Sequence, residues 1–341
     1  MPASYANFRF KFVSPNGKAE GFFPLYGRVD EETQLRLGEY TVQFADLKDV
    51  WRAGNRLALV LKPYIAVPKI VTEHLMPNTT TFIIEITDQP AEEVKSAIDQ
   101  HRSAREVFLK KNVMVAEERA DDFRALSCPY CSAVVDMSER HDSLYVYCNY
   151  CTHIFDRTGN PTPQGEEMEI CPECEYFGRV TDYEEFHFYK NKNAIRNEKK
   201  EHLCCDTCAS TFYEEMKWKN AMFLVGLPYN LKLKSKLDAG KNYNWEGIRQ
   251  ANAAAQNGNL EEAANIYTNI LVKNKAHPGI HYNIGLMYFK AGMLEKAAKH
   301  FEKSLEYCAN YEPTLKLLAY YKEVSWKVRV STPKTGKNRL G

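Results

Sequence analysis

Cysteines dominate the chemistry that this sequence could perform. Nine of the ten cysteines lie between residues 128 and 208, and eight of these form four Cys-x-x-Cys pairs. The pairs are Cys128/Cys131, Cys148/Cys151, Cys171/Cys174 and Cys205/Cys208. Two thiols two residues apart can bind one ion from a single tight turn, and two such turns complete a tetrahedral zinc site. The spacing therefore predicts two Zn²⁺ ions on eight thiolates, with no open coordination position for catalysis.

The grouping of the four pairs into two sites is left open by the sequence. Sixteen residues separate the first two pairs and thirty separate the last two; the first spacing is usual for such sites. The first half resembles a zinc ribbon, which favours sequential grouping into tandem ribbons. Alternate grouping would give a cross-braced finger of the RING or FYVE type. Cys204 directly precedes Cys205, and the Cys-x-x-Cys register favours Cys205 as the ligand.

Other uses of this region are less well supported by its composition. Four histidines lie among the pairs, and with eight well-spaced thiols available we expect them to be surface or packing residues. They are His141, His153, His187 and His202. A disulfide framework would suit a secreted protein, but residues 1–12 contain no apolar run. No apolar stretch approaches the roughly 20 residues that span a bilayer, so we expect a soluble, cytoplasmic protein.

An internal repeat follows the cysteine region. Gly258-Asn-Leu-Glu-Glu-Ala-Ala recurs as Gly292-Met-Leu-Glu-Lys-Ala-Ala, 34 residues later, and 34 residues is the tetratricopeptide period. Residues 242–326 resemble the tetratricopeptide family, and the copy with Gly285 and Phe301 is the closer match. The resemblance implies paired helices with a concave, peptide-binding groove. The residues expected to bind a partner are Arg249, Asn252, Gln256, Tyr282, Asn283, Leu286 and Lys290.

The first third of the chain shows the pattern of short β-strands. Phe8, Phe10 and Phe12 alternate with polar residues, which is typical of a half-buried strand. Further runs of this kind are Gln34–Leu37, Tyr40–Phe44, Asp49–Trp51, Leu57–Leu61 and Thr80–Ile86. From Pro90 onward, an apolar stripe predicts a helix. Its members are Val94, Ala97, Ile98, Ala104 and Phe108. This order of elements resembles a pleckstrin-homology-type barrel, which implies a platform for lipid headgroups or peptides.

Charge is distributed unevenly along the chain, although its net value is +1. Residues 1–118 carry 15 basic and 16 acidic side chains, residues 128–219 carry 10 and 17, and residues 227–341 carry 18 and 9. Affinity for nucleic acid comes largely from neutralised phosphates, so the balance of −7 over residues 128–219 argues against a nucleic-acid ligand. The basic stretch 190–200 is the one candidate element for such binding. The balance of +9 over the repeats favours an acidic or amphipathic protein or peptide partner. No P-loop, dinucleotide, hydrolase or kinase signature occurs, so we expect no enzyme.

These patterns predict a multidomain α+β protein. We expect a β-barrel or sheet with a C-terminal helix over 1–118 and a double zinc ribbon over 119–226. A linker over 227–241, all-α repeats with a capping helix over 242–328 and a disordered basic tail over 329–341 would follow. The expected function is a non-enzymatic scaffold that binds a protein through its repeats and holds two structural zinc ions. The alternatives are a nucleic-acid-binding zinc-ribbon protein and a cross-braced, ubiquitin-ligase-like finger. A further hypothesis is that the acidic cysteine region docks on the basic repeats of the same chain.

Overall fold

The chain folds into two compact units. One comprises Met1–His141 and Cys148–Pro163, and the other comprises Asp142–Tyr147 and Gln164–Gly341. The computed structural model of the chain describes residues 6–30, 34–63, 65, 69–162, 168–191, 194–220, 226–239, 245–274 and 276–320. The predicted tail 329–341 lies outside these described residues. The division cuts through the predicted zinc module 119–226, because its two halves belong to different units.

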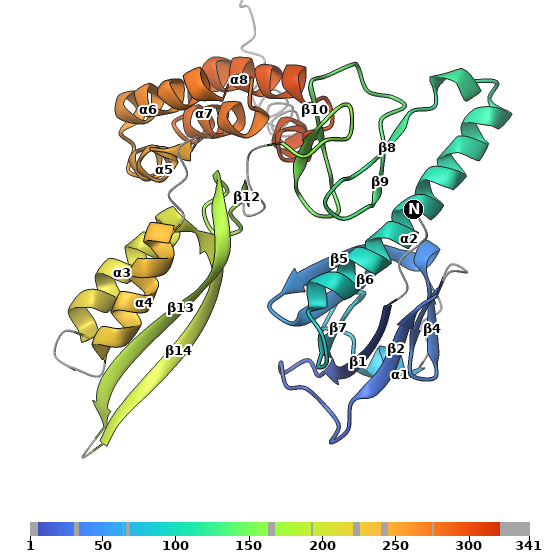
Figure 1. The fold of residues 1–341 in the computed structure, drawn as a ribbon, viewed down its shortest axis with the longest axis horizontal. Coiled ribbons are helices and arrows are strands. Elements are labelled where there is room, and N and C mark those ends of the chain that lie inside the picture. Colours follow the sequence, from blue (N-terminus) through green and yellow to red (C-terminus); the bar gives the residue numbers. More distant parts are fainter. Residues whose placement is uncertain are drawn as a thin grey trace, which may run out of the picture. The chain divides into compact units, whose positions relative to one another are not determined.

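The first unit is built on a seven-stranded antiparallel sheet with the order β4-β3-β2-β1-β7-β6-β5 (Figure 1). Its strands are β1 Ala6–Val13, β2 Leu25–Val29, β3 Gln34–Leu37, β4 Tyr40–Gln43, β5 Leu47–Ala53, β6 Arg56–Leu61 and β7 Thr81–Ile86. Phe8, Phe10 and Phe12 point into the core, as their alternation predicts. Strand β2 was not predicted, because it lacks the alternation of apolar and polar residues. Its Gly27 lies opposite Phe8, and a Cβ at Gly27 would come within 2.3 Å of the Phe8 ring.

The sheet is open, so the predicted barrel is wrong. Strands β4 and β5 form its two edges and do not pair with each other. After β4, which has only four residues, the chain enters the 3₁₀ turn η1 Phe44–Asp46. The Phe44 ring stacks on His101 at a centroid distance of 5.5 Å. A helix therefore covers the core at this place, where a barrel would need strand pairing.

Helix α2, Ala91–Ala116, follows Pro90 as predicted and packs its first half on the sheet. Val94, Ala97 and Ile98 are buried in the common core. The predicted stripe does not continue, because Ala104 is exposed and the Phe108 side chain is 52% exposed. A polar set of side chains is buried at this level of the helix, and it comprises Asp99, Arg102 and Ser103. The short elements of this unit are α1 Lys69–Glu73, η2 Ala120–Asp122, β8 Ala125–Ser127, β9 Val134–Asp136 and β11 Ile154–Asp156.

The second unit contains a long β-hairpin, β13 Phe177–Asn191 with β14 Ala194–Cys205, backed by helices α3 Asp206–Asn220 and α4 Leu227–Ala239 (Figure 1). Strand β12 Met168–Ile170 extends the hairpin to a three-stranded sheet, and β10 Tyr145–Tyr147 also belongs to this unit. The predicted linker 227–241 is therefore mostly helical. Leu233 and Leu237 of α4 are buried in the same cluster as Tyr183 and Phe186 of the hairpin. Because these two leucines are four residues apart, they lie on one face of the helix. The segment therefore packs on the hairpin and is not an extended linker.

The repeats form two helical hairpins. They are α5 Ile248–Gln256 with α6 Leu260–Lys273, and α7 Pro278–Lys290 with α8 Leu294–Tyr307; residues 312–320 are also helical. Gly258 and Gly292 adopt φ values of +80° and +74° at the two equivalent turns, which L side chains rarely adopt. Gly285 lets the hairpin close, since a Cβ there would come within 2.5 Å of the Phe301 ring. No helix among the described residues is long and apolar enough to cross a bilayer.

Candidate metal centres and the repeat surface

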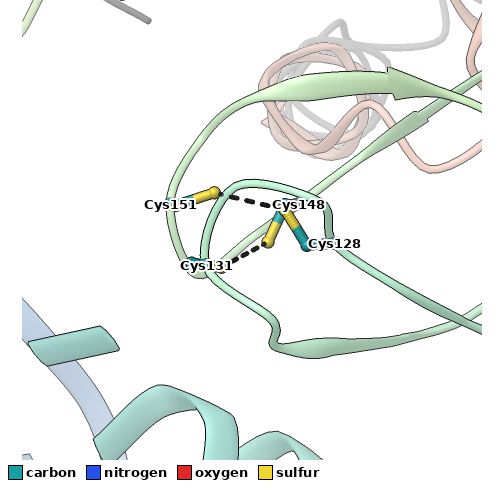
Figure 2. A group of neighbouring side chains, drawn as sticks. All are labelled: Cys128, Cys131, Cys148 and Cys151. Atoms are coloured by element: carbon teal, nitrogen blue, oxygen red, sulfur yellow. Dashed lines mark hydrogen bonds between the residues drawn. The ribbon is translucent and has the colours of Figure 1, made fainter. Parts of the chain in front are cut away.

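The first candidate centre consists of Cys128, Cys131, Cys148 and Cys151. Figure 2 shows their thiols turned toward one another from two loops of the first unit. The sulfur atoms of Cys128 and Cys151 lie 3.6 Å apart, and those of Cys131 and Cys148 lie 3.7 Å apart. Three of the four cysteines are buried, and Cys151 is partly exposed.

The second candidate centre consists of Cys171, Cys174, Cys205 and Cys208, all in the second unit. Its sulfur atoms lie 4.0 Å apart between Cys171 and Cys208 and 3.6 Å apart between Cys174 and Cys205. The four pairs are thus grouped sequentially, as the spacing favoured. The alternate grouping of a cross-braced finger is wrong for this chain.

Both sets of thiols have the dimensions of a tetrahedral metal site. An ion held by four thiolates at about 2.3 Å separates its sulfur atoms by about 3.8 Å, and the four distances above span 3.6–4.0 Å. In each centre the four sulfur atoms lie within 4.8 Å of one another. Four soft sulfur donors in a compact tetrahedron suit a d¹⁰ ion and fill its coordination sphere.

Three of the four Cys-x-x-Cys turns share one backbone geometry. In each, the carbonyl oxygen of the first cysteine accepts a hydrogen bond from the backbone amide of the residue after the second cysteine, at 2.8–2.9 Å. That following residue has a positive φ in every case: 60° for Ser132, 65° for Thr152 and 70° for Glu175. The left-handed residue reverses the chain direction at the end of each of these turns. This pattern was not visible in the sequence, because none of the three residues is a glycine.

The fourth turn differs because a helix begins inside it. Cys205 ends β14, and Cys208 lies in the first turn of α3. The amide of Cys205 donates to the sulfur of Cys171 at 3.2 Å. The positive end of the α3 dipole therefore faces a thiolate cluster, which favours its negative charge.

Cys204 and the histidines lie outside both tetrads, as expected. Cys204 is fully buried in the apolar cluster between the hairpin and α3, and burial raises the pKa of its thiol. It is therefore a neutral packing residue. The Nδ1 atom of His153 lies 2.8 Å from the carbonyl oxygen of Cys151. His187 and His202 both contact Glu185.

Helix α2 holds the first centre through polar contacts. The Ser103 hydroxyl accepts a hydrogen bond from the Val134 amide at 2.9 Å. Tyr150, which lies inside the second Cys-x-x-Cys turn, donates from its hydroxyl to Glu106 at 2.8 Å. The guanidinium of Arg102 lies 5.0 Å from the centre of the Tyr150 ring. These contacts explain why polar side chains are buried in the middle of α2.

The two asparagines expected to bind a partner hold a segment of their own chain. Asn283 accepts from the Phe177 amide at 2.6 Å, and its side-chain nitrogen donates to the Phe177 carbonyl at 2.8 Å. Asn252 donates to the same carbonyl at 3.1 Å. Both asparagines are buried, and Tyr267 donates its hydroxyl hydrogen to Asn252 at 2.7 Å. Both asparagines therefore bind Phe177 of their own chain, and their predicted contact with a partner stays a prediction.

The Phe177 ring fills an aromatic seat on the repeats. It lies 5.1 Å from His277 and 5.7 Å from Trp245, measured between ring centroids. Gly279 makes room for it, because a Cβ at that position would lie 2.7 Å from the ring. His277 is fully buried, which lowers its pKa to about 3 and keeps the imidazole neutral. Sequence reasoning missed this seat, since its members lie on separate elements.

The remaining predicted groove residues divide into three groups. Lys290 donates to the Cys174 carbonyl at 3.1 Å and pairs with Glu175, so it also contacts the second centre's turn. Tyr282 and Leu286 are buried within the repeats and offer no free surface. Arg249 and Gln256 instead line an open cleft of about 510 Å³ between α3, α4 and α5.

Asn310 binds a backbone segment in the same way as Asn283 binds Phe177, and the sequence did not predict it. We call such a pair of hydrogen bonds from one asparagine side chain to one residue's backbone an asparagine clamp. Asn310 accepts from the Tyr147 amide at 2.9 Å and donates to the Tyr147 carbonyl at 2.7 Å. Ser143 Oγ accepts from the Ala309 amide at 3.2 Å. The residues after α8 thus hold a second extended segment by the same bidentate geometry that Asn283 uses.

Comparison with known proteins agrees with the repeat assignment. A family model described as the tetratricopeptide repeat matches residues 278–311, which cover α7, α8 and the turn that follows. Neither the curated proteins nor the solved structures compared with this chain gave a match. Residues 278–311 are therefore similar to a tetratricopeptide repeat, a unit that generally mediates protein–protein interaction.

Proposed function

We propose that this protein is a non-enzymatic, cytoplasmic scaffold that binds a protein partner beside its repeats and holds two structural zinc ions. The observation that carries the proposal is the open cleft of about 510 Å³ against α5 of the repeats. Its volume lies within the range of known ligand sites. The tetratricopeptide match at residues 278–311 supports a protein as the ligand.

Zinc is the metal that best suits the two tetrads. Its filled d¹⁰ shell imposes no coordination geometry of its own, so the ion accepts a tetrahedron. Four thiolates form a closed structural zinc site in many small domains. Such a site binds no substrate, so the ions stabilise folding and perform no chemistry. This agrees with the absence of catalytic signatures from the sequence.

The charges of the cleft favour an acidic peptide segment. Arg249 and Lys234 line it, and their side chains have no polar partner among the described residues. The acidic residues of the cleft are already engaged: Glu214 lies 3.5 Å from Lys217, and Asp238 also has an interaction partner. The free charges are therefore cations, and uncharged donors such as Gln250 and Gln256 surround them. Complementary charges of this kind mainly provide specificity and a faster association.

The proposal is tested with a labelled amphipathic peptide of alternating Glu and Leu and with its Lys-Leu counterpart. The wild-type protein should bind the acidic peptide with an affinity that falls as salt increases, and the double variant R249E/K234E should lose at least tenfold. Lys299→Glu is the matched control, since this exposed lysine of α8 lies outside the cleft. Equal binding by R249E/K234E and wild type would refute the cleft as the partner site.

The two alternative functions receive less support. Lys199 pairs with Glu184 and Glu201, and Lys200 pairs with Glu198, so part of the basic hairpin is neutralised within the chain. Such pairs reduce the attraction of the hairpin for phosphates. Sequential grouping of the thiols removes the cross-brace that a ubiquitin-ligase-like finger would need.

A further inference from the structure

The second centre and the repeats share one short loop. In that loop, the backbone carbonyl of Tyr176 accepts a hydrogen bond from the Cys171 amide at 3.0 Å, which closes the turn that carries Cys171 and Cys174. The next residue is Phe177, whose backbone is held by Asn252 and Asn283. The order of this loop therefore depends on both of its sides, the thiolates and the repeats.

The repeats need this loop to satisfy their own polar groups. The side chains of Asn252 and Asn283 are 1% and 0% exposed, and the Phe177 backbone provides three of their hydrogen bonds. A buried amide that loses its partners costs free energy. In addition, two repeats bury too little apolar surface, and arrays of this type need about three or more units for stability. Phe177 and Tyr176, each 1% exposed, add apolar contacts that a further repeat would otherwise supply.

The loop also needs the metal. Four thiolates within 4.8 Å of one another repel, and a bound cation offsets that repulsion. Without the ion, the turn at Cys171–Cys174 loses the restraint that connects it to Cys205 and Cys208. Helix α3, which forms one wall of the cleft, starts at this fourth turn, and its Thr207 hydroxyl donates to the Arg249 carbonyl at 3.2 Å.

We propose that metal binding at the second centre controls the order of the repeats and of the cleft beside them. With the ion bound, the loop at Phe177 is fixed, the asparagines are satisfied, and α3 is held against α5. When the ion leaves, the loop, the repeats and the cleft loosen together. This inference rests on the proposed function, since it makes partner binding in the cleft dependent on the metal.

The first test compares loss of each centre in the full-length chain. Cys174→Ser removes a ligand of the second centre, and Cys131→Ser removes a ligand of the first as the matched control. Hydrogen exchange measured by mass spectrometry should become at least tenfold faster in peptides from α5 and α7 of Cys174→Ser. In Cys131→Ser the peptides from α5 should exchange as in wild type, because Tyr147, which precedes Cys148, is held by Asn310 at the other end of the repeats. Unchanged exchange in Cys174→Ser, or equal acceleration in both variants, would overturn the proposal.

The second test uses the reciprocity of coupled equilibria. If the metal orders the repeats, the clamp must strengthen metal binding by the same factor. Asn283→Ala should therefore lower zinc affinity at the second centre about tenfold or more, measured by chelator competition in a Cys131→Ser background. Asn310→Ala is the control, because it removes an equivalent clamp that holds Tyr147 instead. An unchanged affinity in Asn283→Ala would refute the coupling, while the peptide test of the cleft would still decide the scaffold function.

Discussion

The contact between Gly279 and Phe177 predicts that Gly279→Ala changes stability in opposite directions in two backgrounds. It should destabilise the wild-type chain and stabilise a chain that carries Phe177→Ala. A methyl group at Gly279 would lie 2.7 Å from Cγ of Phe177 and 2.8 Å from both Cδ atoms. These distances are far below van der Waals contact, and the ring, enclosed by Trp245 and His277, has little room to move. Gly279→Ala in the wild-type chain is therefore an overpacking substitution.

The magnitude follows from two opposing effects. Overpacking of a well-filled core costs about 1–3 kcal/mol, whereas replacing a helical glycine with alanine contributes about 0.5–1 kcal/mol of stability. Overpacking is the larger effect, so Gly279→Ala should destabilise the repeats by about 1 kcal/mol. Phe177→Ala alone should cost about 3–5 kcal/mol, since it removes a buried ring. In that background the clash is gone, and Gly279→Ala should stabilise by about 0.5–1 kcal/mol.

Native-state hydrogen exchange of peptides from α7 measures these free energies locally, without requiring that the two units unfold together. The four proteins of the cycle should give a coupling energy of about 2 kcal/mol between the two positions. A Gly279→Ala effect of equal size and sign in both backgrounds would show that the ring does not occupy this seat. Metal content should be measured in parallel, because Phe177 lies three residues after Cys174.

Two further predictions concern single residues. Cys204→Ala should retain two zinc ions per chain, because Cys204 packs outside the tetrads, whereas Cys205→Ser should retain one; equal stoichiometry by atomic emission would contradict the assignment. Burial lowers the pKa of His281 and of His300 to about 4, below the unfolded value of about 6.5. The folded repeats thus favour neutral rings, so their stability is complete above about pH 6.5 and decreases as the pH falls toward 4. His300→Gln should reduce this decrease in urea titrations across the pH range, and a wild-type stability that stays constant from pH 7 to 4.5 would refute the argument.

Features with short-range causes could be predicted from the sequence. The cysteines of each Cys-x-x-Cys pair lie within one turn, so their spacing alone predicts which thiols lie together. The repeats depend on helices that pack against their neighbours in sequence, and the glycines at 258 and 292 mark equivalent turns. Strand β3 was predicted with its observed bounds, Gln34–Leu37, because its alternation reports on burial at each residue.

Features with long-range causes could not be predicted. Phe177 and Asn283 are 106 residues apart in the chain, and Tyr147 and Asn310 are 163 residues apart. No local pattern reports such a contact, since an asparagine on a helix has the same propensity whatever it binds. The open sheet was missed for a related reason: strand order along the chain does not reveal whether the two edges pair.

The position of Phe177 explains why a partner should bind beside the asparagines of the groove instead of between them. A side-chain amide offers one donor and one acceptor to any extended backbone, so Asn252 and Asn283 cannot by themselves distinguish a foreign peptide from their own chain. A tethered segment has an effective concentration in the millimolar range, and the metal-binding turn further restricts the loop at Phe177. A free peptide with the same contacts would have to exceed that concentration to displace it. Arg249 and Gln256 are on the same helix as Asn252 but line the open cleft, and they face no such competitor among the residues that the structure describes.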